Sequence, residues 1–349
     1  MKKSCHLTKK SQTNPQHVAS KSRKLSDPQS ADEMIQDFSR VNFLVVTANQ
    51  EGQRIDNFLL ARLKGLPRSH LYRLIRNDEI RVNKKRIKPH DRVSAGDVVR
   101  IAPVRLSVRQ EPVISDEFAS SLLNRIIFED EGLIVFNKPQ GMAVHGGSAE
   151  SFGVIEAMRM AMGKKYLELI HRIDKDTSGL LLIAKKRSTL KQLQDNFRKK
   201  TIKKSYLCLA TGHVKVDEQL IDKPLLKYVL AGGERRTKVS QEGKSSQTHV
   251  KTLARFDIEG MPVSLVLASP LTGRTHQIRV HMASIGHALL GDDKYLTVLA
   301  PSVPRLCLHA WRLTVPNDDG SPSHFTADIP SDMANLFPKD SGGVIEYGG

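Results

Sequence analysis

A short polar segment ahead of an apolar run contains the residues best suited to acid–base chemistry. Residues 171–179 are HRIDKDTSG, and the apolar residues 180–184 (LLLIA) follow directly. Turn-forming polar residues before a buried strand place reactive groups at a sheet end, where binding groups often lie. Asp174 stands between Arg172 and Lys175, which would keep its carboxylate ionised. The alternative is a surface turn whose Asp and Ser side chains merely satisfy backbone donors.

A second candidate segment, residues 270–281 (PLTGRTHQIRVH), has the pattern of a turn leading into a helix with two arginines and two histidines. His276 and His281 lack the i, i+4 spacing of a helical zinc pair, and no Glu lies between them. We therefore expect no metal site here. Contact between these basic side chains and RNA phosphates is the better interpretation.

Together the two segments resemble the HRLD-x-x-TSG and GRTHQ-x-R motifs of the RluA-type pseudouridine synthases. Ile173 replaces the usual Leu, which changes no reactive group. The resemblance covers about residues 125–330 and includes further segments: 137–142 (NKPQGM), 203–206 (KKSY), 291–295 (GDDKY) and 305–310 (RLCLHA). It implies an enzyme that flips a uridine out of RNA, breaks the bond from C1′ to N1 and joins C1′ to C5. The reaction gains and loses no atoms, and we expect no cofactor.

The resemblance also assigns roles to single residues. Asp174 is the catalytic carboxylate that acts at the ribose, as a carboxylate does in glycoside cleavage; Asp176, its competitor, falls at a variable family position. Arg279 is expected to hold Asp174 and balance its charge. Tyr206 maps to an aromatic hydroxyl near C5 of the base, although a tyrosine packed on the core is the alternative. Arg172 is expected to enter the stack that the flipped uridine leaves.

Other residues of these motifs are expected to contact the substrate. Leu308 is predicted to pack on the base. The predicted RNA contacts are His171, Arg274 and His276.

The elements that position these residues follow from the apolar pattern. Strand-like runs lie at residues 126–128, 133–136, 179–184, 206–210, 248–253 and 263–267, and helical segments at 153–162, 190–197 and 275–285. Strands outnumber helices and are joined mostly by short turns. We therefore predict an α+β fold whose catalytic domain has a mixed, mostly antiparallel sheet flanked by helices.

A small α+β module precedes this domain. Residues 43–46 have the pattern of a strand, 54–63 and 68–76 that of helices, and 80–101 that of a hairpin. Residues 52–103 resemble the S4 RNA-binding domain. That family serves synthetases, ribosomal proteins and modification enzymes alike, so the module by itself indicates no chemistry.

The module is strongly basic, with twelve Lys and Arg against four acids between residues 54 and 92. A solvated basic face is one explanation, and docking to the phosphates of folded RNA is the one we favour. The predicted RNA-binding residues are Arg68, Arg73, Arg76, Lys84, Lys85, Arg86 and Lys88.

The domain order follows from composition. Residues 1–40 are predicted to be a disordered basic tail, 41–103 the S4 domain, 104–122 a linker, 123–338 the catalytic domain and 339–349 a C-terminal tail.

The whole chain of 349 residues carries a formal charge of +17, which favours a polyanionic partner. Membranes are also anionic, but no stretch approaches a membrane span and the basic start lacks an apolar signal segment. Three scattered cysteines fit a reducing compartment. The family resemblance implies 23S rRNA or a pre-50S particle as the partner, and we expect a cytoplasmic monomer that binds neither DNA nor membranes. A non-catalytic rRNA-binding factor, and a synthase for tRNA or small-subunit rRNA, remain alternatives.

Overall fold

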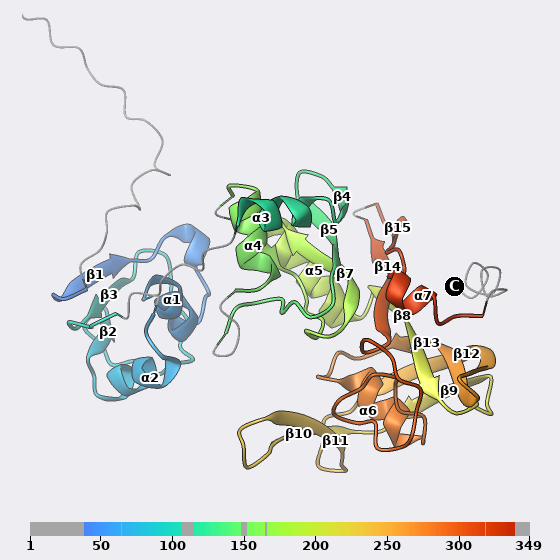
Figure 1. The fold of residues 1–349 in the computed structure, drawn as a ribbon. Coiled ribbons are helices and arrows are strands. Elements are labelled where there is room, and N and C mark those ends of the chain that lie inside the picture. The colour runs from blue at the N-terminus through green and yellow to red at the C-terminus, as the bar shows by residue number, and fades with distance from the viewer. Residues whose placement is uncertain are drawn as a thin grey trace, which may run out of the picture. The chain divides into compact units, whose positions relative to one another are not determined.

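The computed structural model describes residues 38–63, 65–106, 115–147, 152–164, 166–317 and 319–338. The chain divides into two compact units, Met1–Glu111 and Pro112–Gly349 (Figure 1). The predicted C-terminal tail, most of the predicted N-terminal tail and part of the predicted linker lie outside the described residues. In the described ranges, no helix has the length and apolar character needed to cross a bilayer.

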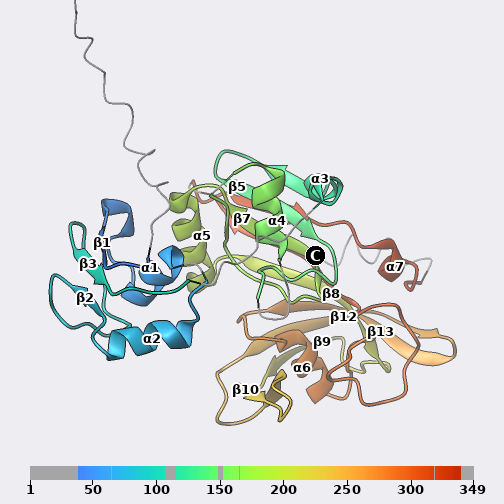
Figure 2. The same cartoon turned by 60° about the vertical axis from the view of Figure 1, so that its left-hand side comes forward.

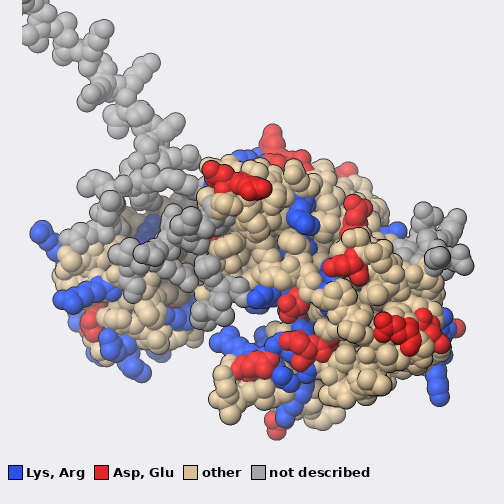
Figure 3. Space-filling view, viewed as in Figure 1, with Lys and Arg blue, Asp and Glu red and all other residues tan. Residues whose placement is uncertain are grey.

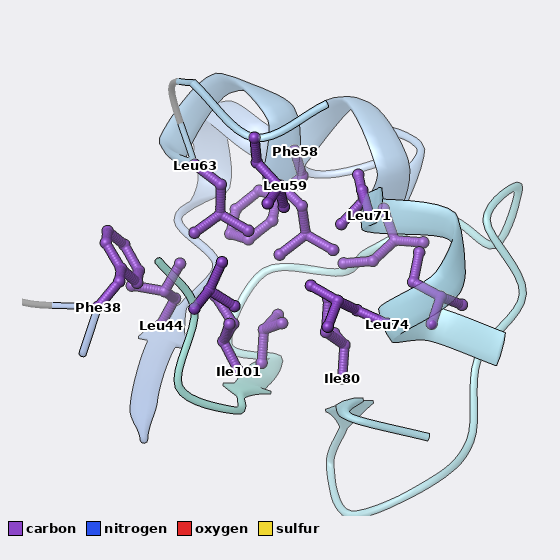
Figure 4. Packing of buried hydrophobic residues seen from close by; sticks show 14 of the residues in the cluster. Phe38, Leu44, Phe58, Leu59, Leu63, Leu71, Leu74, Ile80 and Ile101 are labelled. Carbon is purple, nitrogen blue, oxygen red and sulfur yellow. The ribbon is translucent and has the colours of Figure 1, made fainter. Parts of the chain in front are cut away.

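The first unit packs two helices on one face of a small antiparallel sheet. Its elements are β1 (Asn42–Val45), a 3-10 turn (Ala48–Gln50), α1 (Ile55–Arg62), α2 (Arg68–Arg76), β2 (Ile80–Val82) and β3 (Val98–Ile101), with the strand order β1-β3-β2. Leu71, Leu74 and Ile75 share one face of α2 because they lie three and four residues apart, and all three are buried. They pack with Phe58 and Ile101 in the core of the unit (Figure 4).

This core extends beyond the predicted bounds of the module. Phe38 and Val104 are both buried in it, and the amide of Val104 donates to the carbonyl of Phe38 over 2.7 Å. This hydrogen bond joins the first and last parts of the unit's core. The sequence did not predict it, because a single apolar residue on each side forms no periodic pattern.

The second unit is built on a ten-stranded sheet with the order β4-β5-β7-β14-β8-β13-β12-β9, to which β15 and β6 are added on β14 and β7. Every pairing is antiparallel except that of β7 with β14. The strands are β4 (Ile126–Glu129), β5 (Leu133–Lys138), β6 (Glu168–Leu169), β7 (Ser178–Ala184), β8 (Lys203–Thr211), β9 (Glu218–Asp222), β12 (Gln247–Ile258), β13 (Met261–Pro270), β14 (Leu308–Pro316) and β15 (Pro322–Thr326). The predicted mixed, mostly antiparallel sheet is confirmed.

Helices cover both faces of this sheet (Figure 2). They are α3 (Asp116–Leu123), α4 (Val154–Ala161), α5 (Arg187–Lys199), α6 (Gln277–Ser284) and α7 (Ser331–Ala334). Helices α3 and α4 pack on one face of β5 and β7, and α5 packs on the other. Strand β7 is consequently buried along its whole length, and this explains its continuous apolar sequence. Helix α6 packs on β8 and β13.

Some elements of the second unit were not predicted. Helix α3 lies in the segment expected to be a linker, and Ala119 and Leu122 bury its inner face. Its start is marked by Ser115, whose hydroxyl accepts a hydrogen bond from the amide of Phe118 over 3.2 Å. The separate hairpin of β10 (Leu225–Val229) and β11 (Arg235–Val239) was also missed because basic residues mask its alternation.

Strands β7 and β14 approach each other at a glycine. Gly179 has φ +104°, and a Cβ atom there would lie 2.2 Å from the carbonyl oxygen of Ala310. Only glycine fits this position without displacing β14. The close pairing brings the turn before β7, which carries Asp174, next to the start of β14 at Leu308.

Candidate active site

A cavity of about 820 Å³ opens at this end of the sheet. Its walls come from the turn before β7, the C-terminal end of α5, the start of β8, the turn before α6 and the first residue of β14. Among the described residues that line it, Asp174 is the single carboxylate, and Asp176 is absent. The lining Lys and Arg residues are Arg172, Arg198, Lys200, Lys203, Lys204, Arg274 and Arg279. One acid surrounded by cations suits a polyanionic substrate.

The Asp174 turn is held from below by a buried lysine. The Nζ atom of Lys138, at the end of β5, donates to the carbonyls of Pro139, Met142 and Lys175 over 2.7, 2.8 and 2.9 Å. Burial lowers the pKa of Lys138 to about 7, against the opposing charges of Asp176 and Asp174. The lysine is fully buried, so its three bonds fix the backbone that presents Asp174.

A second buried network anchors the end of the same turn. The guanidinium of Arg305 donates to Oγ of Ser178 over 2.5 Å, and this Oγ lies 2.8 Å from Nδ1 of His309. The other ring nitrogen, Nε2, lies 3.3 Å from the carbonyl of Ala327. Burial, reinforced by the charge of Arg305, lowers the pKa of His309 to about 4. The neutral ring therefore donates to Ala327 and accepts from Ser178.

Arg279 lies in the cavity wall on α6 and is almost fully buried. Its guanidinium binds Asp292 through two bonds of 2.7 and 2.5 Å and Asp293 through one of 3.0 Å. Burial alone would lower the pKa of Arg279, but the hydrogen bonds and charge of Asp292, together with the charges of Asp174 and Asp293, raise it.

The predicted charge balance between Arg279 and Asp174 does not take the form of a direct ion pair among the described residues. In the part of the chain that the structure describes, the ion pairs of Arg279 are with Asp292 and Asp293. Asp292 thus compensates the charge of Arg279 from inside the protein, while Arg279 lines the cavity. Arg279 and Asp174 still line the same cavity and interact electrostatically.

One aromatic and one aliphatic side chain complete the lining of the cavity. Tyr206 on β8 and Leu308 on β14 both line the cavity, and Tyr206 contacts the cores on both sides of it. Burial, followed by the charge of Asp174, raises the pKa of Tyr206. Its hydroxyl is therefore protonated near neutral pH.

His171 lines the cavity, where its RNA contact stays a prediction, and its ring is also held by the fold. Its Nε2 accepts a hydrogen bond from the amide of Leu182 over 3.1 Å, and its ring packs on Phe197 with a centroid distance of 4.8 Å. Burial, followed by the charge of Lys204, lowers the pKa of His171 to about 3. The ring is therefore neutral near pH 7, and the amide of Leu182 and the ring of Phe197 fix its orientation.

The other predicted cavity contacts differ in exposure. Arg172 and Arg274 are exposed at the cavity, as a group that meets RNA must be. His276 lies deeper, with Nε2 4.0 Å from Oδ2 of Asp174 and Nδ1 2.7 Å from the hydroxyl of Tyr295.

In the first unit, the predicted RNA-binding residues are all exposed: Arg68, Arg73, Arg76, Lys84, Lys85, Arg86 and Lys88. Figure 3 shows Lys and Arg side chains projecting from the surface of this unit. Arg86 is partly neutralised by Asp78 at 3.3 Å. Elsewhere in the described ranges, no group of three or more His, Cys, Asp or Glu side chains is arranged to hold a metal ion.

Comparison with known proteins identifies the family. A model described as RNA pseudouridylate synthase matches residues 132–284, and the S4 domain model matches residues 53–99. The ribosomal large subunit pseudouridine synthase C of Escherichia coli O157:H7 is 45% identical over 304 residues, which cover 80% of this chain and 94% of that protein. The chain belongs to the RNA pseudouridine synthase family. The matched range includes Asp174, Tyr206 and Arg279.

Other relatives agree. Proteins with the same name from Haemophilus influenzae and Yersinia pestis are 45% and 50% identical, over 86% and 73% of this chain and 95% and 79% of theirs. Among solved structures, human RNA pseudouridylate synthase domain containing 1 has a TM-score of 0.52 and 26% identity over 63% of this chain and 87% of that one. The synthase thus shares both fold and sequence with this family.

Sequence reasoning missed the residues that support the site: Lys138, Asp292, Tyr295, Arg305 and His309. Each lies in a segment that the resemblance had marked, but without a role. A lysine that follows a run of apolar residues in a strand, as Lys138 does, is a usable sign of a buried amine.

Proposed function

We propose that this synthase isomerises specific uridines to pseudouridine in 23S (large-subunit) ribosomal RNA. The observation that carries the proposal is the cavity with one carboxylate, Asp174, among seven Lys and Arg side chains. Its volume of about 820 Å³ suits one nucleotide. The choice of large-subunit RNA rests on relatives that are themselves ribosomal large subunit pseudouridine synthases C.

The chemistry follows from the geometry. A uridine leaves its stack and enters the cavity, and exposed Arg172 fills the gap that it leaves. Asp174 meets the electron-poor C1′ as the bond to N1 breaks, and the released uracil turns and joins through C5. The hydrogen on C5 then leaves as a proton. Neutral Tyr206 relays this proton: its oxygen accepts it while its own proton passes to the released carboxylate of Asp174. A proton then adds to N1 of the base, which restores the carboxylate and balances the isomerisation, and Leu308 packs on the base.

The buried cation supports this role for Asp174. Arg279 keeps its positive charge because Asp292 compensates it from behind. The field of the guanidinium at the cavity favours the negative charge that develops on the released base.

We also propose that the first unit docks the RNA through its exposed basic residues, and that the protein acts as a cytoplasmic monomer on 23S rRNA or the pre-50S particle. Seven exposed Lys and Arg on α2 and the turn after β2 support the docking role. Removing residues 41–103 should weaken rRNA binding and flatten its dependence on salt, because fewer phosphate contacts release fewer counterions. Unchanged affinity and slope would contradict this role.

Mapping of pseudouridines in large-subunit rRNA tests the substrate. A strain that lacks the protein should lose specific pseudouridines, and the wild-type gene should restore them. Asp176→Asn is a matched control because Asp176 is not among the lining residues; it should restore them as well, whereas Asp174→Asn should not. Loss confined to tRNA or small-subunit rRNA would overturn the substrate assignment.

A further inference from the structure

A chain of polar contacts leads from the β10–β11 hairpin to Asp174. The amide of Thr237, on β11, donates to the hydroxyl of Tyr295 over 3.0 Å. That hydroxyl lies 2.7 Å from Nδ1 of His276, whose Nε2 lies 4.0 Å from Oδ2 of Asp174. His276 and Asp174 line the cavity, whereas Thr237 and Tyr295 stand behind it.

The donors and acceptors in this chain fix which ring nitrogen carries the proton. A backbone amide can only donate, so the hydroxyl of Tyr295 accepts from Thr237. The side chain of Thr237, which also interacts with that hydroxyl, can donate to its second lone pair, so the proton of the hydroxyl points to Nδ1 of His276 at 2.7 Å. Nδ1 therefore carries a lone pair, and the neutral imidazole has its proton on Nε2, which faces Asp174.

Both ends of this arrangement are held firmly. The amide of Tyr295 donates to Asp292 over 3.0 Å, and the guanidinium of Arg279 lies 5.3 Å from the centre of the phenol ring. Lys294 forms an ion pair with Glu234, which follows the tip of the hairpin. Turning the phenol away from His276 would break its contact with Arg279 and the hydrogen bond that its hydroxyl accepts from Thr237.

The backbone of His276 is strained. Its φ of 52° is in the left-handed region, which residues with a Cβ rarely adopt. Such strain persists where the surroundings hold it, and often at functional sites. Burial, with the charges of Arg279 and Lys294, lowers the pKa of His276 against the opposing charges of Asp174 and Asp292. The imidazole thus stays neutral, as the proton assignment requires.

We propose that His276 is a positioning residue for the isomerisation, in which Tyr295 holds the imidazole with Nε2–H toward Asp174 and this N–H orients the carboxylate. The proposal rests on the proposed function. The N–H shares its proton and does not transfer it. From 4.0 Å, a movement of about 1 Å gives a hydrogen bond. Asp174 would then keep one oxygen directed to the ribose.

Tyr295→Phe tests the arrangement because it removes the hydroxyl and keeps the ring against Arg279. In the wild-type protein, ¹⁵N NMR of histidine-labelled protein should show His276 with its proton on Nε2; the signal is assigned by its loss in His276→Gln. In Tyr295→Phe the two tautomers should mix. The kcat should fall about 2- to 12-fold, the range of one neutral hydrogen bond, with KM within about twofold. Tyr166→Phe, an exposed tyrosine, is the control.

A pair of variants separates positioning from packing. His276→Gln keeps an N–H donor at the reach of Nε2, whereas His276→Leu has none. We expect Gln to keep kcat within about threefold and Leu to lower it by about tenfold or more. His213→Leu, at an exposed histidine, should change neither constant.

Three results would overturn the proposal: a proton on Nδ1 in the wild-type protein, equal loss of kcat in the Gln and Leu variants, or a rise in KM alone in Tyr295→Phe. The NMR result needs no activity and therefore stands even if a variant folds poorly. Failure of the proposed function is separate, because wild-type protein would then form no pseudouridine in large-subunit rRNA.

Discussion

Replacing Asp292 by asparagine tests how the buried charge of Arg279 is held. The side chains of Asp292 and Arg279 are 0% and 2% exposed, and two hydrogen bonds join them. Removing one partner of a buried ion pair costs about 3–5 kcal/mol, because the other charge is left uncompensated. Asp293, 3.0 Å away, compensates part of that charge. We therefore expect Asp292→Asn to lower the free energy of unfolding by about 3 kcal/mol.

The assay is thermal unfolding at pH 7. In a domain of about 150–250 residues, 1 kcal/mol shifts Tm by about 2–4 °C, so Asp292→Asn should lower Tm by about 6–12 °C. Asp293→Asn is a matched control, since Asp293 binds the same guanidinium but is 68% exposed. An exposed pair contributes up to about 1 kcal/mol, which corresponds to at most about 4 °C. Equal shifts in the two variants would refute the reasoning.

A double variant distinguishes the lost charge balance from lost packing. Replacing both partners of a buried pair by apolar groups of similar size is often nearly neutral. Arg279→Met with Asp292→Leu should therefore be more stable than Asp292→Asn alone, although inactive. A double variant that is less stable than the single one would show that packing, together with the acceptor that Asp292 offers to the amides of Lys294 and Tyr295, outweighs the lost charge balance.

Three further changes test the supports of the site. Burial holds the pKa of His309 at about 4 against an ordinary 6.5, so the stability that this histidine contributes is full above pH 6.5 and is lost as the pH falls toward 4. His309→Asn should therefore flatten the plot of Tm against pH between these values. An unchanged slope would contradict this expectation. Gly179→Ala should prevent folding because its Cβ would lie 2.2 Å from the carbonyl oxygen of Ala310, whereas Gly147→Ala, in open space, should change stability by at most about 0.5 kcal/mol. Lys138→Met should lower the free energy of unfolding by about 3 kcal/mol or more, and kcat at least about tenfold, because three carbonyls lose their donor. Wild-type stability in urea unfolding would count against this.

The strongly patterned elements of the fold could be predicted from the sequence. Helix α2 is buried on one face and therefore has one apolar face. Strand β7 is buried on both faces and therefore has a continuous apolar sequence. Helix α3 has only two buried residues, and the β10–β11 hairpin has basic residues on both strands, so neither gives a clear period. Phe38 contributes to the core through a pairing with Val104 that is distant in sequence.

The site could be predicted in its residues but not in their partners. The family resemblance implied that Asp174, Tyr206 and Arg279 act together, and all three line one cavity. The partner of Arg279 is set by how α6 packs against the loop that follows it, and Asp292 is as suitable chemically as Asp174. The same holds for His171, whose ring nitrogen is taken by a strand amide that no local pattern reveals.

Release of tritium from large-subunit rRNA labelled at C5 of uridine tests the central role of Asp174 most directly, because the hydrogen on C5 leaves only if the base is rejoined through C5. The wild-type synthase should release tritium, and Asp174→Asn should release none while binding the same RNA with affinity within about threefold, since asparagine has nearly the same shape. Continued release by Asp174→Asn would contradict the account.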